Sequence, residues 1–247
     1  MTVVAGGNRG EEARSGTVRL LKPAFFGVSA VLFTAAVAAT LALCSAMAGM
    51  GEVPTAGGWT MSGAWLPMCG QSWSATAVSF LLMWLVMMVA MMQPSLTPAL
   101  WRFNEALRTS GTPQPYLMTI LAGMGYYAVW ALAGIAVFAL GAMLTSAATQ
   151  FPALARALPA AGNSVVLAAG AFQLSRWLGD TSERCGKQRS ERLSPGAAWR
   201  HGLRLGCECC RSCAAPMVIL IIGGVMDLRL MTGVTALITA ERLGRGA

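Results

Sequence analysis

Long runs of apolar residues, separated by short polar stretches, dominate the pattern of this chain. Four runs approach or exceed the roughly 20 residues that a helix needs to cross a bilayer; they cover residues 23–50, 75–100, 116–146 and 158–178. A fifth run, residues 214–240, is interrupted by Asp227 and Arg229. We therefore predict an all-α, polytopic transmembrane helical bundle of about five spans. The last segment either crosses once with a polar middle or forms a re-entrant pair of half-helices.

The start of the chain also resembles a cleaved signal peptide, because a basic stretch precedes an apolar run that ends near Ala46-Met47-Ala48. The apolar part of a signal peptide has about 7 to 15 residues, whereas this run is longer than 20. We interpret it as an uncleaved first span. Residues 1–22 then form a cytoplasmic basic tail, and residues 23–247 form a single membrane domain.

Basic side chains gather in alternate polar stretches, and this asymmetry predicts the orientation. Fourteen Lys and Arg residues lie before the first run, after the second run or in residues 176–211, whereas the other two loops hold one. Lys and Arg are enriched in cytoplasmic loops. We therefore predict a multi-pass protein of the bacterial inner (cytoplasmic) membrane, with a cytoplasmic N-terminus and a cytoplasmic Cys/His/Arg-rich loop at residues 179–213.

The composition supports this class and excludes others. Of the 247 residues, 55% are hydrophobic and 11% are charged, compared with about 25% charged residues in an average soluble domain. The net charge is +8, but the sequence has no basic patch with interleaved aromatic residues. We therefore expect the lipid bilayer as a partner, and not nucleic acid. The chain has one histidine and no common catalytic motif, so we expect that it is not an enzyme.

Candidate metal ligands cluster in the predicted cytoplasmic loop: Cys185, His201, Cys207, Cys209, Cys210 and Cys213. Thiolate and thioether sulfurs are soft ligands that select Cu(I), zinc or iron–sulfur centres. If a helix begins near Cys209, then Cys209 and Cys213 are four residues apart on one face and can share an ion. A redox role for these thiols, or a cluster at the membrane edge that binds nothing, are the alternatives.

A second set of sulfur atoms lies in and before the second apolar run: Met61, Met68, Cys69, Met87, Met88, Met91 and Met92. Met87 and Met91 continue a row from Met83 along one helical face, and Met88 and Met92 form an adjacent row. A methionine row at helical spacing is also typical of plain packing. Met61, Met68 and Cys69 favour the metal interpretation, because they place soft donors at the predicted outer end of the same helix.

Several segments resemble a bacterial family of uncharacterised predicted metal-binding integral membrane proteins, some of which are labelled copper chaperones. They are W-L-V-M-M-V-A-M-M-Q-P-S-L-T-P from Trp84, F-Q-L-S from Phe172, H-G-L-R-L-G from His201, and G-V-M-D-L-R-L-M with I-T-A-E-R-L near the C-terminus. The likeness covers residues 58–243. It implies metal-associated positions at Met87, Met88, Met91, Met92, Cys209 and Cys213.

Two functions of different classes follow. The first is a protein that binds or handles a soft metal ion, Cu(I) before zinc, through Met and Cys side chains, as a chaperone or in transfer across the membrane. Its partner would be a metal-receiving protein. The second is an accessory or assembly subunit of a larger membrane complex, with no metal chemistry of its own. Glycines of the third run, such as Gly123, Gly134 and Gly141, would allow the close helix packing that such an assembly needs.

Overall fold

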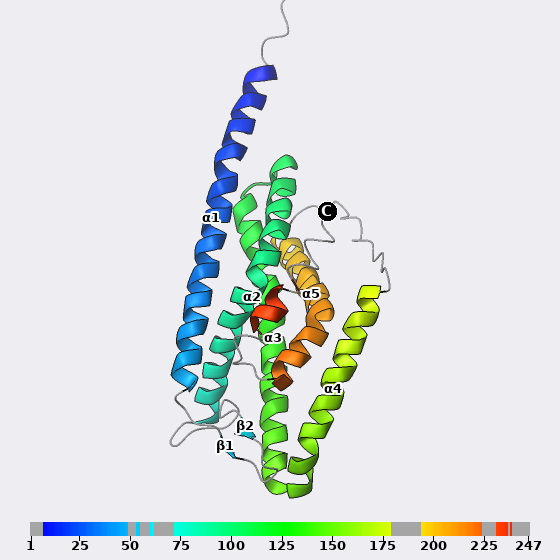
Figure 1. The fold of residues 1–247 in the computed structure, drawn as a ribbon. Coiled ribbons are helices and arrows are strands. Elements are labelled where there is room, and N and C mark those ends of the chain that lie inside the picture. The colour runs from blue at the N-terminus through cyan, green and yellow to red at the C-terminus, as the bar shows by residue number, and fades with distance from the viewer. Residues whose placement is uncertain are drawn as a thin grey trace, which may run out of the picture.

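The computed structural model describes residues 7–48, 53–54, 60–61, 72–178, 194–223, 231–236 and 238. Five long helices dominate it: α1 (Gly7–Ala48), α2 (Trp73–Thr109), α3 (Pro115–Gln150), α4 (Pro152–Leu178) and α5 (Pro195–Gly223) (Figure 1). Two short strands, β1 (Val53–Pro54) and β2 (Thr60–Met61), pair antiparallel between α1 and α2, with Val53 opposite Met61.

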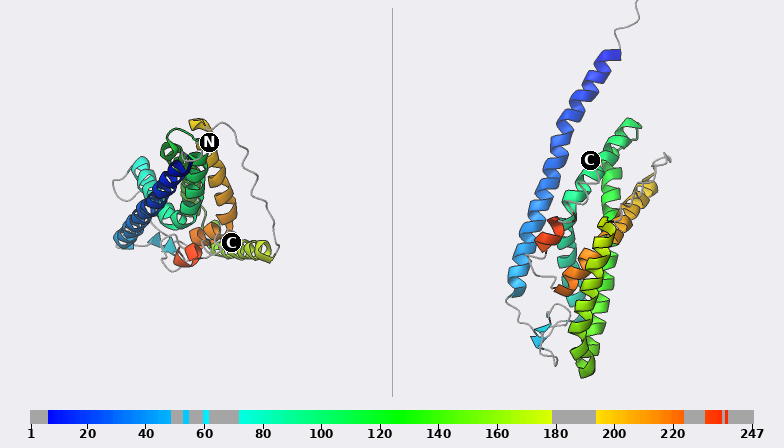
Figure 2. Two further views of the ribbon diagram at one scale, coloured as in Figure 1. Left: turned by 90° about the horizontal axis from the view of Figure 1, so that it is seen from above. Right: turned by 45° about the vertical axis from the view of Figure 1, so that its right-hand side comes forward.

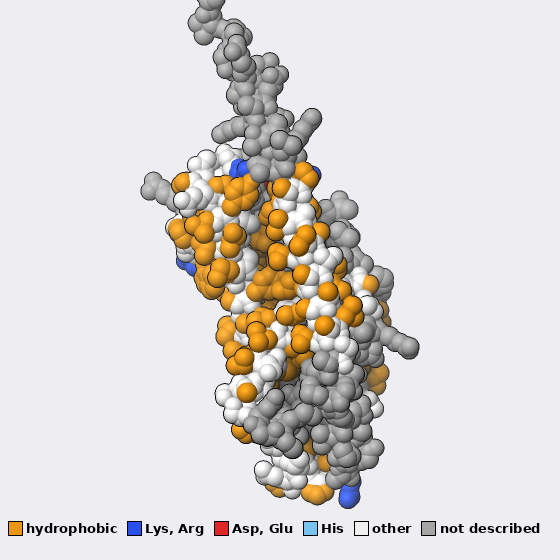
Figure 3. All heavy atoms as spheres, turned by 90° about the vertical axis from the view of Figure 1, so that its left-hand side faces the viewer, with side chains coloured by type: hydrophobic (Ala, Val, Ile, Leu, Met, Phe, Trp, Pro, Cys, Tyr) orange, Lys and Arg blue, Asp and Glu red, His pale blue; other side chains and the backbone are white. Residues whose placement is uncertain are grey.

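The predicted class is confirmed, because five helices in the described part of the chain are long and apolar enough to cross a membrane. Consecutive helices run in alternating directions (Figures 1 and 2). The first helix already includes residues 7–22 of the predicted tail. Pro94 and Pro98 lie inside α2 and do not end it. Hydrophobic side chains spread over the outside of the bundle, as Figure 3 shows for one face.

The predicted loop at residues 179–213 is wrong in its second half, because α5 begins at Pro195. The arginines and cysteines of this segment suggest a loop when only the sequence is considered. In the structure, buried positions such as Ala198, Gly202 and Cys209 recur at helical spacing and face the bundle. The fifth candidate span of the described residues is therefore this helix, which begins earlier than the predicted run at residues 214–240 and shares residues 214–223 with it. Asp227 and Arg229 lie outside the described residues, and so does the choice between one span and a re-entrant pair.

The core of the bundle lies between α2, α3 and α5. The Trp84 indole Nε1–H donates a 2.9 Å hydrogen bond to the Trp130 carbonyl oxygen and ties α2 to α3. Nearer the other end of these helices, the fully buried Asn104 Nδ2 donates to Thr119 Oγ1 at 2.9 Å. Buried side chains of residues 231–238 join the same core, among them Met231.

Helices α3 and α5 approach very closely, because glycines replace side chains at their contact. A Cβ atom added at Gly202 would overlap the carbonyl group of Ala122, and one at Gly125 would lie 2.6 Å from the Trp199 carbonyl oxygen. Gly202 and Gly206 are four residues apart, the G-x-x-x-G spacing that brings two membrane helices together. This contact fixes the position of α5 along α3.

Candidate metal site

Helix α2 directs its methionines into the middle of the bundle. Five of them are at most 7% exposed: Met83, Met87, Met88, Met91 and Met92. All five belong to one hydrophobic core, which also contains Met217 and Met231. The sequence therefore predicted the face correctly, and that face is turned towards α3 and α5 rather than towards lipid.

Helix α5 brings two thiols to the end of this methionine row. Cys209 is fully buried and Cys213 is 2% exposed. The Cys209 Sγ atom lies 3.8 Å from Cys213 Sγ and 3.8 Å from Met92 Sδ. The predicted helical pairing of Cys209 with Cys213 is thus present in the structure. We call Met92, Cys209 and Cys213 the sulfur site.

Helix α3 adds a polar contact to the sulfur site. The Tyr126 hydroxyl donates a 3.0 Å hydrogen bond to Cys209 Sγ, and the ring is only 1% exposed. Close packing places it there, because a Cβ atom at Gly206 would be 3.0 Å from the Tyr126 carbonyl oxygen. The neighbouring Tyr127 hydroxyl donates to Gln93 Oε1 at 2.7 Å, so that the tyrosine pair spans from α5 to α2.

The surroundings of the sulfur site are apolar. The buried hydrophobic residues of its cluster include Leu96, Trp130 and Leu220. Such an enclosure excludes water and strengthens every remaining electrostatic interaction, so a donor to the Cys209 sulfur counts for more here than it would in water. The site is therefore a buried group of soft donors, with the Tyr126 hydroxyl directed at Cys209 Sγ and the Ser212 hydroxyl 3.8 Å from Cys213 Sγ.

The sulfur site lies deep within the bundle. Met92 is 19 residues after the start of α2 and 17 before its end, or about 29 Å and 26 Å along the axis at 1.5 Å per residue. Cys209 is 14 residues into α5, which corresponds to about 21 Å. Cys209 and Cys213 therefore lie on a helix and not in a loop as predicted, because helical packing carries them inward. The cytoplasmic side of this segment stays a prediction.

Three other predicted ligands on α5 do not reach the sulfur site. His201 stacks on Phe103, with ring centroids 4.5 Å apart and planes 15° from parallel; it precedes Cys209 by eight residues, about 12 Å along the helix. Cys207 is exposed and Cys210 is half-buried, since both lie on other faces of α5. The two contacts that define the sulfur site, Cys209 Sγ with Cys213 Sγ and with Met92 Sδ, involve none of these three residues.

The remaining predicted ligands cannot be placed. Cys185, Met68 and Cys69 lie outside the described residues. Met61 is in β2, where its backbone pairs with Val53, and its side chain lies outside the described part. Among the residues that the structure does describe, no three His, Cys, Asp or Glu side chains come together as a metal site. The third sulfur that the described structure places beside the cysteine pair is Met92 Sδ, 3.8 Å from Cys209 Sγ.

Sequence reasoning missed three residues of this region. Met217 continues the i, i+4 row of Cys209 and Cys213 on α5, a spacing that could have revealed it. Met231 follows the polar interruption of the last run and gave no periodic signal. Tyr126 is 83 residues from Cys209, and only the packing of α3 against α5 reveals their contact.

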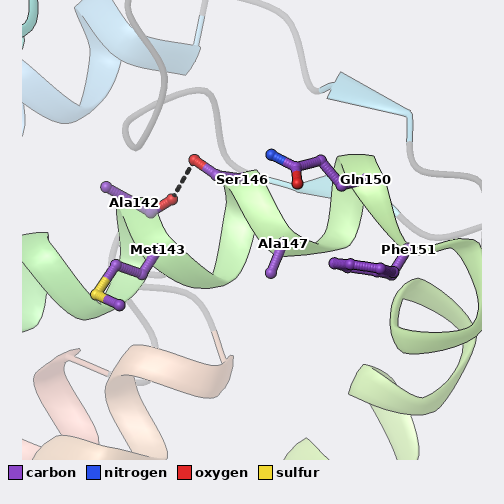
Figure 4. Close-up of a pocket in the computed structure, with 6 residues that line it drawn as sticks. All are labelled: Ala142, Met143, Ser146, Ala147, Gln150 and Phe151. Atoms are coloured by element: carbon purple, nitrogen blue, oxygen red, sulfur yellow. Dashed lines mark hydrogen bonds between the residues drawn. The ribbon is translucent and has the colours of Figure 1, made fainter.

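A hollow of about 370 Å³ lies elsewhere, at the end of α3 where the chain turns into α4 (Figure 4). Its lining includes Met143, Gln150 and Phe151. The Ser146 hydroxyl, which also lines it, donates a hydrogen bond to the Ala142 carbonyl oxygen. Met143 is 17 residues from Tyr126 on the same helix, about 25 Å away. With a single sulfur and no charged group, this hollow is not the metal site.

Fold and site together define a helical membrane protein with a buried cluster of sulfur donors. A sequence model of the PpoB2 family, described as a copper chaperone, matches residues 81–247, which is more than half of the chain and includes the whole sulfur site. The chain belongs to this copper chaperone family. No curated protein and no solved structure matches the chain.

Proposed function

We propose that this protein is a membrane-embedded chaperone that carries Cu(I) on Met92, Cys209 and Cys213. One observation carries the proposal: three sulfur atoms from two helices meet in a dry core, with Cys209 Sγ 3.8 Å from each of the other two. In a membrane protein whose family is described as a copper chaperone, these are the described side chains best suited to hold the cargo.

The spacing of the sulfur atoms suits one shared ion. Sulfurs bound at about 2.3 Å to a common ion lie about 3.8 Å apart at tetrahedral angles and about 4.6 Å apart when opposed. The 3.8 Å separations fall within this range. Binding then needs the loss of thiol protons and small side-chain rotations, and no movement of the helices.

The donor set favours Cu(I) over zinc. Structural zinc takes four ligands, usually cysteine or histidine, in a closed tetrahedron. Here the one histidine stacks on Phe103, and the third donor is the Met92 thioether. Thioethers are soft, neutral ligands that suit Cu(I). Two thiolates with one thioether leave a singly charged complex, and the Tyr126 hydroxyl stabilises that charge.

The methionine row supports a transfer role. Met83, Met87 and Met91 are spaced by one helical turn each, about 6 Å along α2, from near the outer end of the helix towards Met92. An ion can move along such a row by exchanging one thioether for the next. With the predicted orientation, this path begins on the side of Met61, Met68 and Cys69 and ends at the sulfur site.

Two of the three glycines that suggested an accessory subunit pack within the chain. Gly134 is used inside the chain, where an added Cβ would come 2.6 Å from the Trp84 ring, and Gly123 faces Leu100. We also propose that the protein is not an enzyme, because its one histidine is stacked on a ring and the sulfur site offers ligands rather than an acid–base pair.

Metal analysis of the purified protein tests the proposal. The full chain is purified in mild detergent under anaerobic, reducing conditions, loaded with Cu(I), and its copper and zinc are measured. Wild type should retain stoichiometric copper, whereas Cys209→Ser with Cys213→Ser should retain almost none. Cys44→Ser, a change in α1 away from the core, is the control and should behave as wild type. Equal copper in the double variant and wild type would contradict the proposal, as would preferential retention of zinc.

A further inference from the structure

A row of three cysteines on α5 leads from the surface of the bundle to the sulfur site. Cys207, Cys210 and Cys213 are spaced three residues apart, so each is a neighbour of the next on the helix surface. Their exposure falls in order: Cys207 is exposed, Cys210 is half-buried and Cys213 is buried. The row therefore turns gradually around the helix, from the outer face to the core.

The outer end of this row lies on a charged face. Arg204 precedes Cys207 by three residues and Arg211 follows it by four, so both flank the thiol on the same side of α5. Arg200 and Glu208 are also exposed along this part of the helix. Ionised side chains are costly in hydrocarbon and are rare on lipid-facing surfaces. The charged face is thus in contact with water, and Cys207 is accessible from it.

The two rows of sulfur atoms extend from the sulfur site in different directions. The methionine row runs back along α2 to Met83, ten residues from the start of the helix, towards the end that follows β1 and β2. The cysteine row runs back along α5 towards its N-terminus, which points away from β1 and β2 (Figures 1 and 2). A single cargo site between two rows of sulfur is the arrangement that a transfer protein needs.

We propose that Cys207 and Cys210 are exchange ligands, which pass Cu(I) between the sulfur site and a small, anionic thiolate complex of Cu(I) in water. This inference rests on the proposed function. It adds a second, transient binding site on the charged face and states the chemistry of its partner. Three arginines against one glutamate give this face a positive potential, which concentrates anionic carriers and raises the rate of encounter.

Each transfer is a ligand exchange without a change of oxidation state. The Cys207 sulfur forms a bond to Cu(I) as one carrier thiolate leaves, and the Cys207 proton goes to that departing thiolate. The bond to Cys210 forms and the bond to Cys207 breaks in the next step, and the proton moves from Cys210 to Cys207. Cys213 then replaces Cys210 and gives its proton to Cys210. Cys209 replaces the remaining carrier thiolate, which leaves with the Cys209 proton, so that protons balance and no electron is transferred.

Transfer kinetics separate this role from permanent binding. Full-length apoprotein in nanodiscs is mixed with the Cu(I)–glutathione complex, and uptake is followed by stopped flow. Cys207→Ser and Cys210→Ser should each slow uptake by at least about tenfold, because a high local concentration of thiol is lost. Equilibrium stoichiometry and affinity should stay as in wild type. Cys44→Ser should change neither rate nor affinity.

The outcomes distinguish the two proposals. If wild type takes up no copper, the proposed function fails, and this inference fails with it. If wild type takes up copper and both serine variants do so at the same rate, only the cysteine row is overturned. Loss of equilibrium binding in Cys207→Ser or Cys210→Ser would also overturn it, because these residues would then be permanent ligands. Unchanged thermal unfolding of the variants is the check that they are folded.

A charge variant gives an independent measurement. Arg204→Gln leaves every sulfur in place and removes one positive charge beside Cys207. It should slow uptake from the anionic Cu(I)–glutathione complex at low ionic strength, and the difference from wild type should vanish in high salt, since salt screens exposed charges. An equal rate at low salt would contradict an anionic carrier.

Discussion

Helices α4 and α5 differ in how much of each is buried, and their compositions alone would predict the opposite order. Helix α4 is uncharged apart from Arg156 over its described side chains, yet none of its most apolar window is buried. Helix α5 carries four charged residues, and 39% of its window is buried. Lipid is as apolar as a protein core, so hydrophobicity does not decide which helix lies inside a membrane bundle. Four cysteines, and the glycines Gly202 and Gly206 at the contact with α3, mark the inner helix here.

The largest expected effect comes from filling the contact between α3 and α5. Gly202→Leu would force these backbones apart, because even a Cβ atom there overlaps Ala122. Overpacking of this kind costs about 1–3 kcal/mol or more, so we expect a clearly lowered melting temperature in detergent and loss of copper binding.

The matched change on the outer helix is Gly170→Leu, since nothing lies within 4 Å of a Cβ atom at Gly170. It should leave the melting temperature and copper retention close to wild type. If Gly202→Leu and Gly170→Leu lowered the melting temperature equally, close packing would matter no more at α5 than at the outer helix α4.

A smaller effect is expected from replacing the thioether at the sulfur site. Met92→Leu keeps nearly the same volume and so preserves packing, but it removes one of three donors. We expect Cu(I) affinity to fall by about a hundredfold, close to 2.7 kcal/mol, in a competition titration with a chromogenic Cu(I) chelator. Met143→Leu, at a methionine that is 71% exposed on α3, is the control and should bind as wild type.

The smallest effect concerns the hydroxyl beside the thiolate. Tyr126→Phe removes the 3.0 Å hydrogen bond to Cys209 Sγ and keeps the ring. Partners that orient a metal ligand typically contribute 10–100-fold in affinity, so we expect a loss of about tenfold in the same titration. Tyr116→Phe, which removes only an exposed contact with Arg108, should not change affinity. If both tyrosine variants bind alike, Tyr126 has no role in metal binding.

Much of the fold could be predicted because apolar runs of bilayer length have few other uses. Four of the five helices coincide with predicted runs. Helix α5 begins earlier in the chain than the fifth predicted run. In a membrane protein, Arg200, Arg204 and Arg211 suggest a loop until the structure shows that only one face of their helix is polar. Residues 224–230 fall outside the described part, and the topology of the last segment stays a prediction.

The sequence by itself determined that this is a helical membrane protein, that its methionines share one face of α2, and that Cys209 and Cys213 can act together. Helical period and ligand softness suffice for these conclusions, because both are local properties. Only the tertiary structure decided that Met92, 117 residues from Cys209 in the chain, contacts Cys209 and that Tyr126 donates a hydrogen bond to Cys209. Those contacts depend on how closely glycines let α3 and α5 approach, and no local pattern specifies which surfaces will meet.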